Sequence, residues 1–357
     1  MSSRAGLSFG GLLVGIGLGW IVFTSLDISA RSMAWLLIIL GSAVIGATIL
    51  SSVLRVRTGG VISAFAVGLV ISLLMTSGFV GPIGPLAFSK ERTREFTGAV
   101  NASSIHFETK NVNGQVNVSS WTRPNEYNVT LSIRGKGTTE TQAQDALSKL
   151  KESLSTQTQS GVLRLTLAFD VPTGTWNYLE VNVTVHVPAD KITRLDVETT
   201  NGAIIVRDIT ASTLKLKTTN GAILFNNVNA MDVEAGTTNG GISGTVEADK
   251  LSATTTNGAV TVRIPSLRSG NYTLRSTNGL VTADITTGVS TGIRLDLSNT
   301  NGAITVSVPG MSYQTNTAHQ KIGQTLGYET SVIKISVNAR TTNGDIRVTD
   351  IRATTGI

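Results

Sequence analysis

The dipeptide Asn-Gly recurs through the second half of the chain in one hydrophobic frame, and this repeat constrains the fold more than any other feature. Seven copies follow a Thr, and an eighth lies upstream. The first four of the seven are separated by 19, 19 and 18 residues, and the spacing then widens to 21, 23 and 42. A period near 20 is typical of stacked units rather than of a globule with one catalytic cleft. The residues predicted to form structural corners are Asn113, Asn201, Gly202, Asn220, Gly221, Asn239, Gly240, Asn257, Gly258, Asn278, Gly279, Asn301, Gly302, Asn343 and Gly344.

Apolar and polar residues alternate on both sides of each corner. Around Asn201 the apolar positions are Leu195 and Val197 before it and Ile204 and Val206 after it. Alternation at period two indicates two half-buried strands joined at the corner. Asn-Gly also favours hairpins, so an antiparallel meander is the alternative. Because each repeat has a single corner and returns to the same phase, we predict a mainly β protein, a parallel β-solenoid of about eight rungs.

The corner residues suggest how neighbouring rungs contact one another. Stacked Asn side chains can donate and accept along a ladder. A buried amide ladder and corners that are merely solvated turns are the two alternatives. Each Gly is expected to adopt the positive φ of a sharp corner. The Thr before each Asn gives the most uniform outward row. A structural hydroxyl ladder and a flat surface that recognises an ordered polymer such as a glycan both fit that row.

The ends of a solenoid must be covered, because an open rung exposes apolar core and unpaired backbone. The solenoid domain is predicted over residues 86–357. Within it, residues 119–188 are predicted to form an α+β cap at the N-terminal end, with a helix from about Thr139 to Ser155. Residues 309–331 interrupt the period and are predicted to be an insertion loop.

Residues 1–85 differ in composition from the rest of the chain. They contain three uncharged apolar runs, which cover residues 7–26, 33–54 and 60–80. Each run is long enough to cross a hydrocarbon core of about 30 Å, and a cleaved signal peptide is the alternative for the first. We therefore predict a three-helix transmembrane region and a protein integral to the cell membrane. An excess of Arg at Arg4, Arg55 and Arg57 favours an extracellular solenoid.

Composition and motifs argue against several kinds of site. The chain has no cysteine, which excludes disulfides and a Cys nucleophile. The net charge of +6 is not gathered into a basic stripe with aromatic residues, so nucleic acid is not an expected partner. His106, His186 and His319 lack metal-ligand spacing and are predicted to be solvated. Acidic residues are not expected side by side on neighbouring rungs. We predict no catalytic residues, metal, cofactor or small-molecule substrate, and no enzymatic activity.

The corner frame resembles that of the putative adhesin β-solenoid family, a prokaryotic domain of unknown function. The matching pattern is hydrophobic-x-hydrophobic-x-Thr-x-Asn-Gly-x-Ile-x-Val, as in residues 195–206 and 214–225. The early corner at Asn113 also matches, as does the Val-x-Val-Pro sequence of Val185–Pro188, which precedes the main array of repeats. The resemblance covers roughly residues 95–350. It implies a β-solenoid and brings no catalytic residues.

These observations predict a membrane-anchored cell-surface protein of adhesin type. Its solenoid would bind an extracellular polymer, a surface glycan or a protein partner without catalysis, because a rod displays regularly spaced side chains over a large area. The alternative is an envelope-stress sensor or an accessory subunit of a membrane complex.

Overall fold

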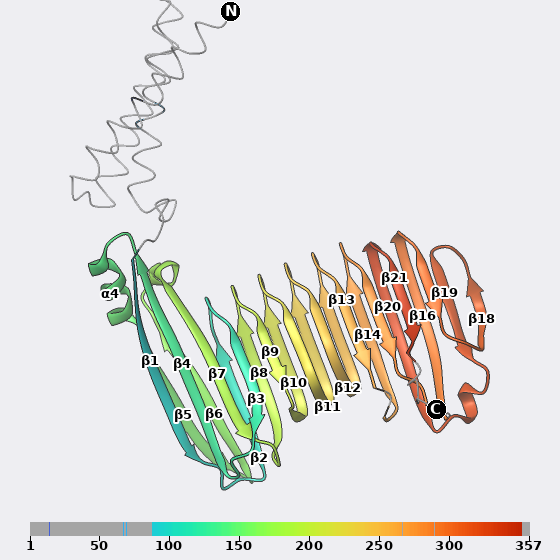
Figure 1. Ribbon diagram of the computed structural model, residues 1–357, viewed down its shortest axis with the longest axis horizontal. Helices are drawn as coiled ribbons and strands as arrows, with labels where there is room; N and C mark the ends of the chain where they lie inside the picture. Colours follow the sequence, from blue (N-terminus) through green and yellow to red (C-terminus); the bar gives the residue numbers. More distant parts are fainter. Residues whose placement is uncertain are drawn as a thin grey trace, which may run out of the picture. The chain divides into compact units, whose positions relative to one another are not determined.

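The computed structural model describes residues 88–265, 267–288 and 290–351, together with Val14, Val67 and Leu69. The chain separates into two compact units, one of residues 1–88 with 137–139 and one of residues 89–136 with 140–357. Nearly all described residues belong to the second unit, whose strands are stacked side by side in Figure 1.

Each rung of the second unit has a strand before an Asn-Gly corner and a strand after it. The strands before the corners form the first sheet, and those after the corners form the second. All pairs of neighbouring rungs are parallel. In spatial order the first sheet contains β2 (Ser104–Lys110), β8 (Ile192–Thr199), β10 (Thr210–Thr218), β11 (Ile223–Thr237), β12 (Ile242–Thr255), β14 (Gly270–Ser276), β20 (Ile333–Asn343) and β16 (Thr291–Asn301). The second contains β3 (Val116–Trp121), β9 (Ile204–Arg207), the first parts of β11 and β12, then β13 (Val260–Ile264), β15 (Val281–Ile285), β21 (Ile346–Asp350) and β17 (Ile304–Ser307).

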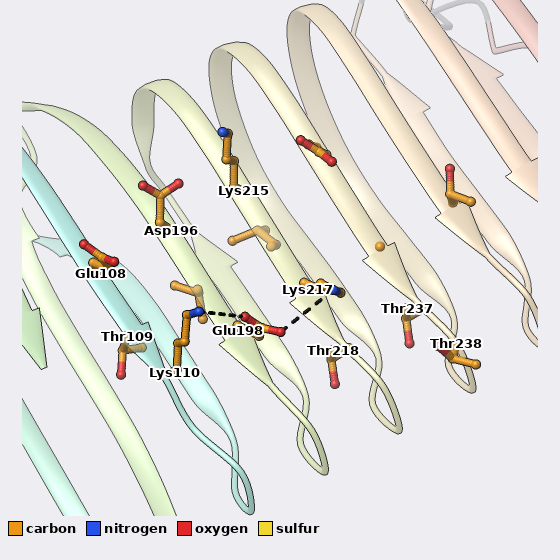
Figure 2. A pocket seen from close by; sticks show the side chains of 15 residues that line it. Glu108, Thr109, Lys110, Asp196, Glu198, Lys215, Lys217, Thr218, Thr237 and Thr238 are labelled. Carbon is orange, nitrogen blue, oxygen red and sulfur yellow. Dashed lines mark ion pairs between the residues drawn. The ribbon is translucent and has the colours of Figure 1, made fainter. Parts of the chain in front are cut away.

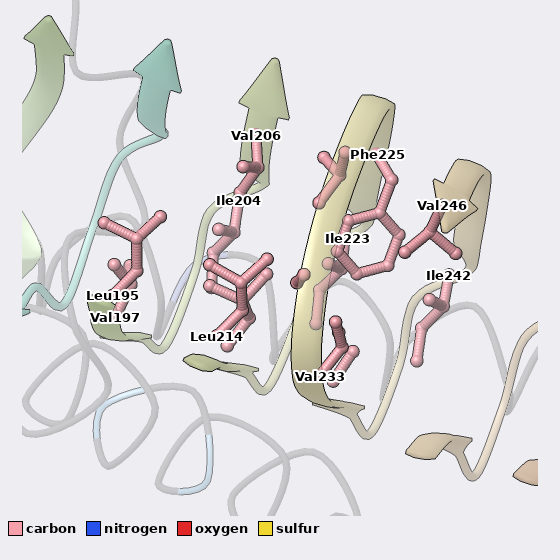
Figure 3. Packing of buried hydrophobic residues seen from close by; sticks show 14 of the residues in the cluster. Leu195, Val197, Ile204, Val206, Leu214, Ile223, Phe225, Val233, Ile242 and Val246 are labelled. Atoms are coloured by element: carbon pink, nitrogen blue, oxygen red, sulfur yellow. The ribbon is translucent and has the colours of Figure 1, made fainter. Parts of the chain in front are cut away.

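In-register stacking places equivalent apolar residues of neighbouring rungs on top of one another. Rungs about 4.8 Å apart bring such side chains into contact, and Figure 3 shows several of them packed between the two sheets. One column of the first sheet, whose members are all at most 3% exposed, is Phe107, Leu195, Leu214, Val233, Leu251, Tyr272, Val337 and Leu295. Burial of each large apolar side chain contributes about 1.5 to 3 kcal/mol. These residues belong to one hydrophobic cluster that extends along the whole stack.

The spatial order of the rungs departs from the chain order near the C-terminal end. β20 and β21 lie between β14–β15 on one side and β16–β17 on the other. The rung that comes later in the sequence is therefore inserted between two earlier ones, as the red strands of Figure 1 show. As a result, β16 and β17 join the stack through β20 and β21.

Antiparallel strands cover the N-terminal end of the stack. β5 pairs antiparallel with β6, and β4 pairs antiparallel with β7. β1 pairs with β4. β6 and β7 then continue the two sheets, because they run parallel to β2 and β3. The elements are β1 (Phe88–Ala99), β4 (Glu126–Gly137), α4 (Glu140–Lys149), β5 (Lys151–Gln159), β6 (Val162–Asp170), η1 (Thr175–Tyr178) and β7 (Leu179–Pro188).

The helix of this cover is shorter than the sequence predicts. It ends at Lys149 instead of continuing to Ser155, because the residues that follow pair with β6. Leu154, for example, lies opposite Leu167. The apolar spacing of this segment fits a helix, but the unpaired edge of β6 is available, so strand pairing overrides the local preference.

A hairpin covers the C-terminal end of the first sheet. β18 (Met311–Asn316) and β19 (Gln320–Thr325) are antiparallel, and β19 pairs antiparallel with β16. The 3-10 helix η2 (Tyr328–Thr330) follows, and its Tyr328 ring is buried beneath Arg294, with 4.3 Å between the guanidinium carbon and the ring centroid. The segment predicted as a loop over residues 309–331 therefore contains regular structure.

The fold-class prediction is wrong in its three-helix transmembrane segment. In the part of the chain that the structure describes, the one α-helix is α4, with ten residues. A helix of that length spans about 15 Å, half of a hydrocarbon core. None of the helices in this part is long and apolar enough to cross a membrane. Apart from Val14, Val67 and Leu69, the predicted spans over residues 7–26, 33–54 and 60–80 lie outside the described residues, and that prediction rested on apolar run length alone.

Candidate binding face

The corner asparagines form a ladder of side-chain amides. In each rung after the first, Nδ2 of the Asn donates to Oδ1 of the Asn in the preceding rung, at N···O distances of 2.6 to 2.9 Å. In the first rung, Nδ2 of Asn113 donates to the carbonyl of Trp176. The spatial order is Asn113, Asn201, Asn220, Asn239, Asn257, Asn278, Asn343 and Asn301. All but the half-buried Asn113 are exposed, so the corners form a ladder that is solvated, and each bond competes with water.

Glycine follows each Asn because the rungs approach closely at this point. A Cβ built on Gly221 would lie 1.9 Å from the carbonyl oxygen of Gly202. The same relation to the neighbouring rung, at 1.9 to 2.2 Å, holds for Gly202, Gly240, Gly258, Gly279, Gly302 and Gly344. The expected positive φ is wrong for most of them. Among the corner glycines only Gly114 and Gly302 have a left-handed φ, of 129° and 137°. Contact between rungs therefore excludes a side chain here.

An inner hydroxyl row, formed by the Thr of the Thr-x-Asn-Gly frame and its equivalents in other rungs, lies just inside the corners. Two residues before the Asn, the hydroxyl of Thr218 donates to the carbonyl of Gly202 at 2.9 Å. The other members, at 2.7 to 3.4 Å from the equivalent carbonyls, are Thr199, Thr237, Thr255, Ser276 and Thr341. All of these hydroxyl residues are buried, so the row pairs buried side-chain hydroxyls with the partly buried corner carbonyls. Its signal in the sequence is a hydroxyl residue that recurs at an inward position of the alternation.

The outer threonine row, formed by the Thr directly before each corner Asn, is different. Its members are all exposed: Thr200, Thr219, Thr238, Thr256, Thr277, Thr342 and Thr300. Within the described part of the chain, none of their hydroxyls takes part in a hydrogen bond. The structural hydroxyl ladder thus lies one residue earlier, in the inner row, and the outer threonines keep free donors and acceptors in regular array.

The outward face of the first sheet is hollowed beside this row. The first hollow has a volume of about 560 Å³ and extends over β2, β8, β10, β11 and β12 (Figure 2). Gly236 lines it, and a Cβ built there would meet no atom within 4 Å. The residues in register on the two neighbouring strands are Lys217 and Thr254. The missing side chain of Gly236 therefore opens the hollow between them.

Charges in the first hollow alternate between neighbouring strands. Glu198 lies between Lys110 and Lys217, with N···O distances of 3.6 and 3.8 Å (Figure 2). Opposite charges side by side stabilise a sheet modestly. Glu108, however, pairs in register with Asp196. Two carboxylates are therefore neighbours, contrary to the sequence prediction, because β2 lies next to β8 although 82 residues separate Lys110 from Ile192.

The histidines are held by local contacts. His106 is only 7% exposed, and its Nε2 lies 2.7 Å from Oδ2 of Asp196, so its prediction as a solvated residue is wrong. His186 is half-buried and stacks on Trp121 with 5.4 Å between ring centroids. Among the residues that the structure describes, no group of three or more potential ligands is placed to hold a metal ion.

A second hollow of about 460 Å³ continues the first over β14, β20 and β16. Thr254 lines both hollows. Outer threonines form part of its wall, namely Thr277, Thr342 and Thr300. The charged residues that line it are Arg275 and Arg340. Together the two hollows form an elongated polar groove that crosses successive rungs of the first sheet.

The fold and this face define a parallel β-solenoid with a polar groove along its first sheet. The chain belongs to the Toastrack DUF4097 family, whose family model matches residues 97–349. Comparison with curated protein sequences gives no match.

Among solved structures, the chain is similar to a putative cell adhesion protein from Clostridium sporogenes, with 12% identity and a TM-score of 0.36 over 73% of this chain and 100% of that one. It is similar to a putative adhesin from Bacteroides fragilis, with 11% identity and a TM-score of 0.32 over 72% and 97% of the two chains. A putative lipid binding protein from Parabacteroides distasonis has 10% identity and a TM-score of 0.30 over 74% and 96%.

Proposed function

We propose that the protein is a non-catalytic, adhesin-like binding protein of the cell surface, and that it holds an extended polymer in the groove of its first sheet. The outer threonine row carries this proposal. Its hydroxyls are exposed and free of hydrogen bonds within the described part of the chain, whereas the neighbouring inner row and the Asn ladder form hydrogen bonds between rungs. Hydroxyl groups that the fold does not use remain available to a ligand.

The arrangement suits an extended ligand that lies across the strands. The same donor recurs on seven successive rungs, at a spacing of about 4.8 Å, and the two hollows share the lining residue Thr254. Each exposed hydroxyl contributes little by itself, because a protein hydrogen bond replaces one to water. A polymer that contacts several rungs at once adds these small contributions. Polymer chains should therefore bind, and their short fragments should bind much more weakly.

A substitution that fills the groove tests the proposal. Gly236→Trp places a large side chain in the first hollow, where a Cβ meets no atom within 4 Å. Binding of the purified full-length chain to cell-envelope polysaccharide should fall at least about tenfold, equivalent to 1.4 kcal/mol. Asn226→Trp, at an exposed site in the second-sheet part of β11, is the matched control and should bind like the wild type. Equal binding by both variants, or no binding by the wild type, would refute the proposal.

The surface location is tested separately. In intact cells, an amine-reactive reagent that does not cross membranes should label Lys217, which is exposed beside the groove. Labelling that appears only after lysis would contradict the location, and capture of one dominant protein by crosslinking would favour an accessory subunit instead.

A further inference from the structure

Two arginines line the second hollow in an arrangement that the fold itself does not favour. Arg275 on β14 pairs in register with Arg340 on β20, and both side chains are exposed. Like charges directly opposite on neighbouring strands destabilise a sheet. Elsewhere on the same face, at the same distance from the corner, Glu198 alternates with two lysines. A residue pair that breaks a local rule of stability is a candidate for function.

The charge of this pair is only partly compensated. Arg340 lies 3.5 Å from Oδ2 of Asp296, but the same oxygen also accepts a hydrogen bond from Nδ2 of Asn338 at 2.8 Å. Arg275 forms no ion pair with any residue in the described part of the chain. Among the residues that the structure describes, no carboxylate lines the second hollow, whereas four carboxylates and three lysines line the first. The groove therefore has one end that carries charges of both signs and one end that carries only positive charges.

We propose that the second hollow binds the anionic groups of the polymer, and that the ligand is an acidic polysaccharide with repeated carboxylate or phosphate groups. This inference rests on the proposed function and adds the charge of the ligand. Guanidinium groups present paired N–H donors that match both anions. Each arginine is followed two residues later by an outer threonine, Thr277 directly after the end of β14 and Thr342 on β20. Their free hydroxyls can bond sugar hydroxyls next to the anion. An anion between the two arginines would also remove their mutual repulsion.

The test compares affinities of the full-length chain for three probes: polygalacturonate, poly(glycerol phosphate) and uncharged dextran. The wild type should bind at least one acidic polymer more tightly than dextran, and added salt should weaken that binding. The double variant Arg275→Gln/Arg340→Gln should lose about tenfold or more in affinity, since each charged hydrogen bond contributes more than a neutral one. The carboxylate and phosphate probes distinguish the two sources of the anion.

The control is Arg207→Gln/Arg263→Gln, which removes the same charge from exposed positions of the second sheet and should leave affinity within about twofold. Thermal midpoints separate a binding role from a structural one. Arg275→Gln should keep or raise the midpoint, because it removes a repulsive neighbour. A lowered midpoint would indicate a structural role and overturn the inference.

The possible outcomes separate the two proposals. Equal affinity of the wild type for dextran and the acidic polymers, with no effect of Arg275→Gln/Arg340→Gln, would overturn the acidic ligand and leave the proposed function standing. Failure of every polymer to bind would overturn both. Tighter binding of single-stranded DNA than of either acidic polymer would overturn the ligand class.

Discussion

The carbonyl oxygen of one corner glycine occupies the space where the glycine of the next rung would carry a side chain. This contact recurs through the stack, for example between Gly202 and Gly221. The Asn of the same corner is held by a surface hydrogen bond, and the residue two places earlier by a buried one. Three nearby residues of one corner thus make three different interactions. The contribution of each interaction to stability can be measured by a separate substitution.

Gly221→Ala should destabilise the protein by about 3 kcal/mol, because backbone must move to accept the methyl group. Gly236→Ala is the matched control, since a Cβ there meets no atom within 4 Å, and it should change the free energy of unfolding by no more than about 0.5 kcal/mol. Chemical denaturation of the two variants measures both. Similar stability of the two variants would show that contact between neighbouring rungs is not the reason for glycine at the corner.

Asn220→Asp removes the donor to Oδ1 of Asn201 and places two oxygens face to face, while the bond from Asn239 can remain. Because the ladder is exposed, we expect a loss of about 1 kcal/mol rather than the larger cost of a buried polar group. Asn226→Asp, which makes the same charge change at an exposed site outside the ladder, is the control. If both variants unfold at the same denaturant concentration, the ladder contributes no net stability.

Thr237→Val keeps the shape of a buried side chain but removes its hydrogen bond to the carbonyl of Gly221. The loss should be about 1 to 2 kcal/mol, since that carbonyl is left without its partner. Thr238→Val changes the adjacent residue, which is exposed and belongs to the outer threonine row, and its effect should stay within about 0.5 kcal/mol. Comparison of their unfolding midpoints tests the assignment of the two rows, and a reversed order of effects would contradict it.

Sequence periodicity predicts which side of each strand a residue faces, but not which contact it makes there. The alternation around Asn201 gives the inward positions Leu195 and Val197 correctly, since both are buried. It cannot show that Thr199, also inward, bonds a glycine of another rung, because that partner, Gly114, lies 85 residues away. Nor does it show whether the corner asparagines are buried, because burial depends on what covers the corner.

At the scale of secondary-structure elements, the inserted C-terminal rung has a direct consequence. β16 and β17 pair with the stack through β20 and β21. A chain that ends at Val332 should therefore leave residues 291–325 accessible to protease and to amide exchange, while β8 to β12 stay protected, because each rung depends mainly on its neighbours. A chain that ends at Ile351 keeps these strands and is the control. Retained protection of β16 in the shorter chain would contradict the pairing.

The repeat spacing could not predict this order. The interval of 42 residues between Asn301 and Asn343 indicates an insertion, yet the pattern of each rung is the same whichever neighbour it meets. Only pairing in space decides that Asn343 lies between Asn278 and Asn301. Likewise, the edge of β6 determines that residues after Leu150 form a strand instead of extending the helix.

At the scale of the whole described solenoid, the groove is formed by residues that do not indicate a binding site when each is considered alone. Gly236 opens the first hollow, and Arg275 and Arg340 give the second its charge. The sequence shows that the outward positions are polar, and it predicts the outer threonine row. It does not show that the two arginines are neighbours, because 65 residues separate them along the chain. The binding face is therefore a product of stacking order as much as of the repeat.

The most direct test of polymer binding along the first sheet is amide hydrogen exchange of the full-length chain, with and without a saturating acidic polysaccharide. Exchange should slow in the segments that carry the groove, residues 196–200, 215–219, 234–238, 275–277 and 340–342, and should be unchanged in β9, β13 and β15. Slower exchange confined to the second sheet, or no change at saturation, would contradict the account.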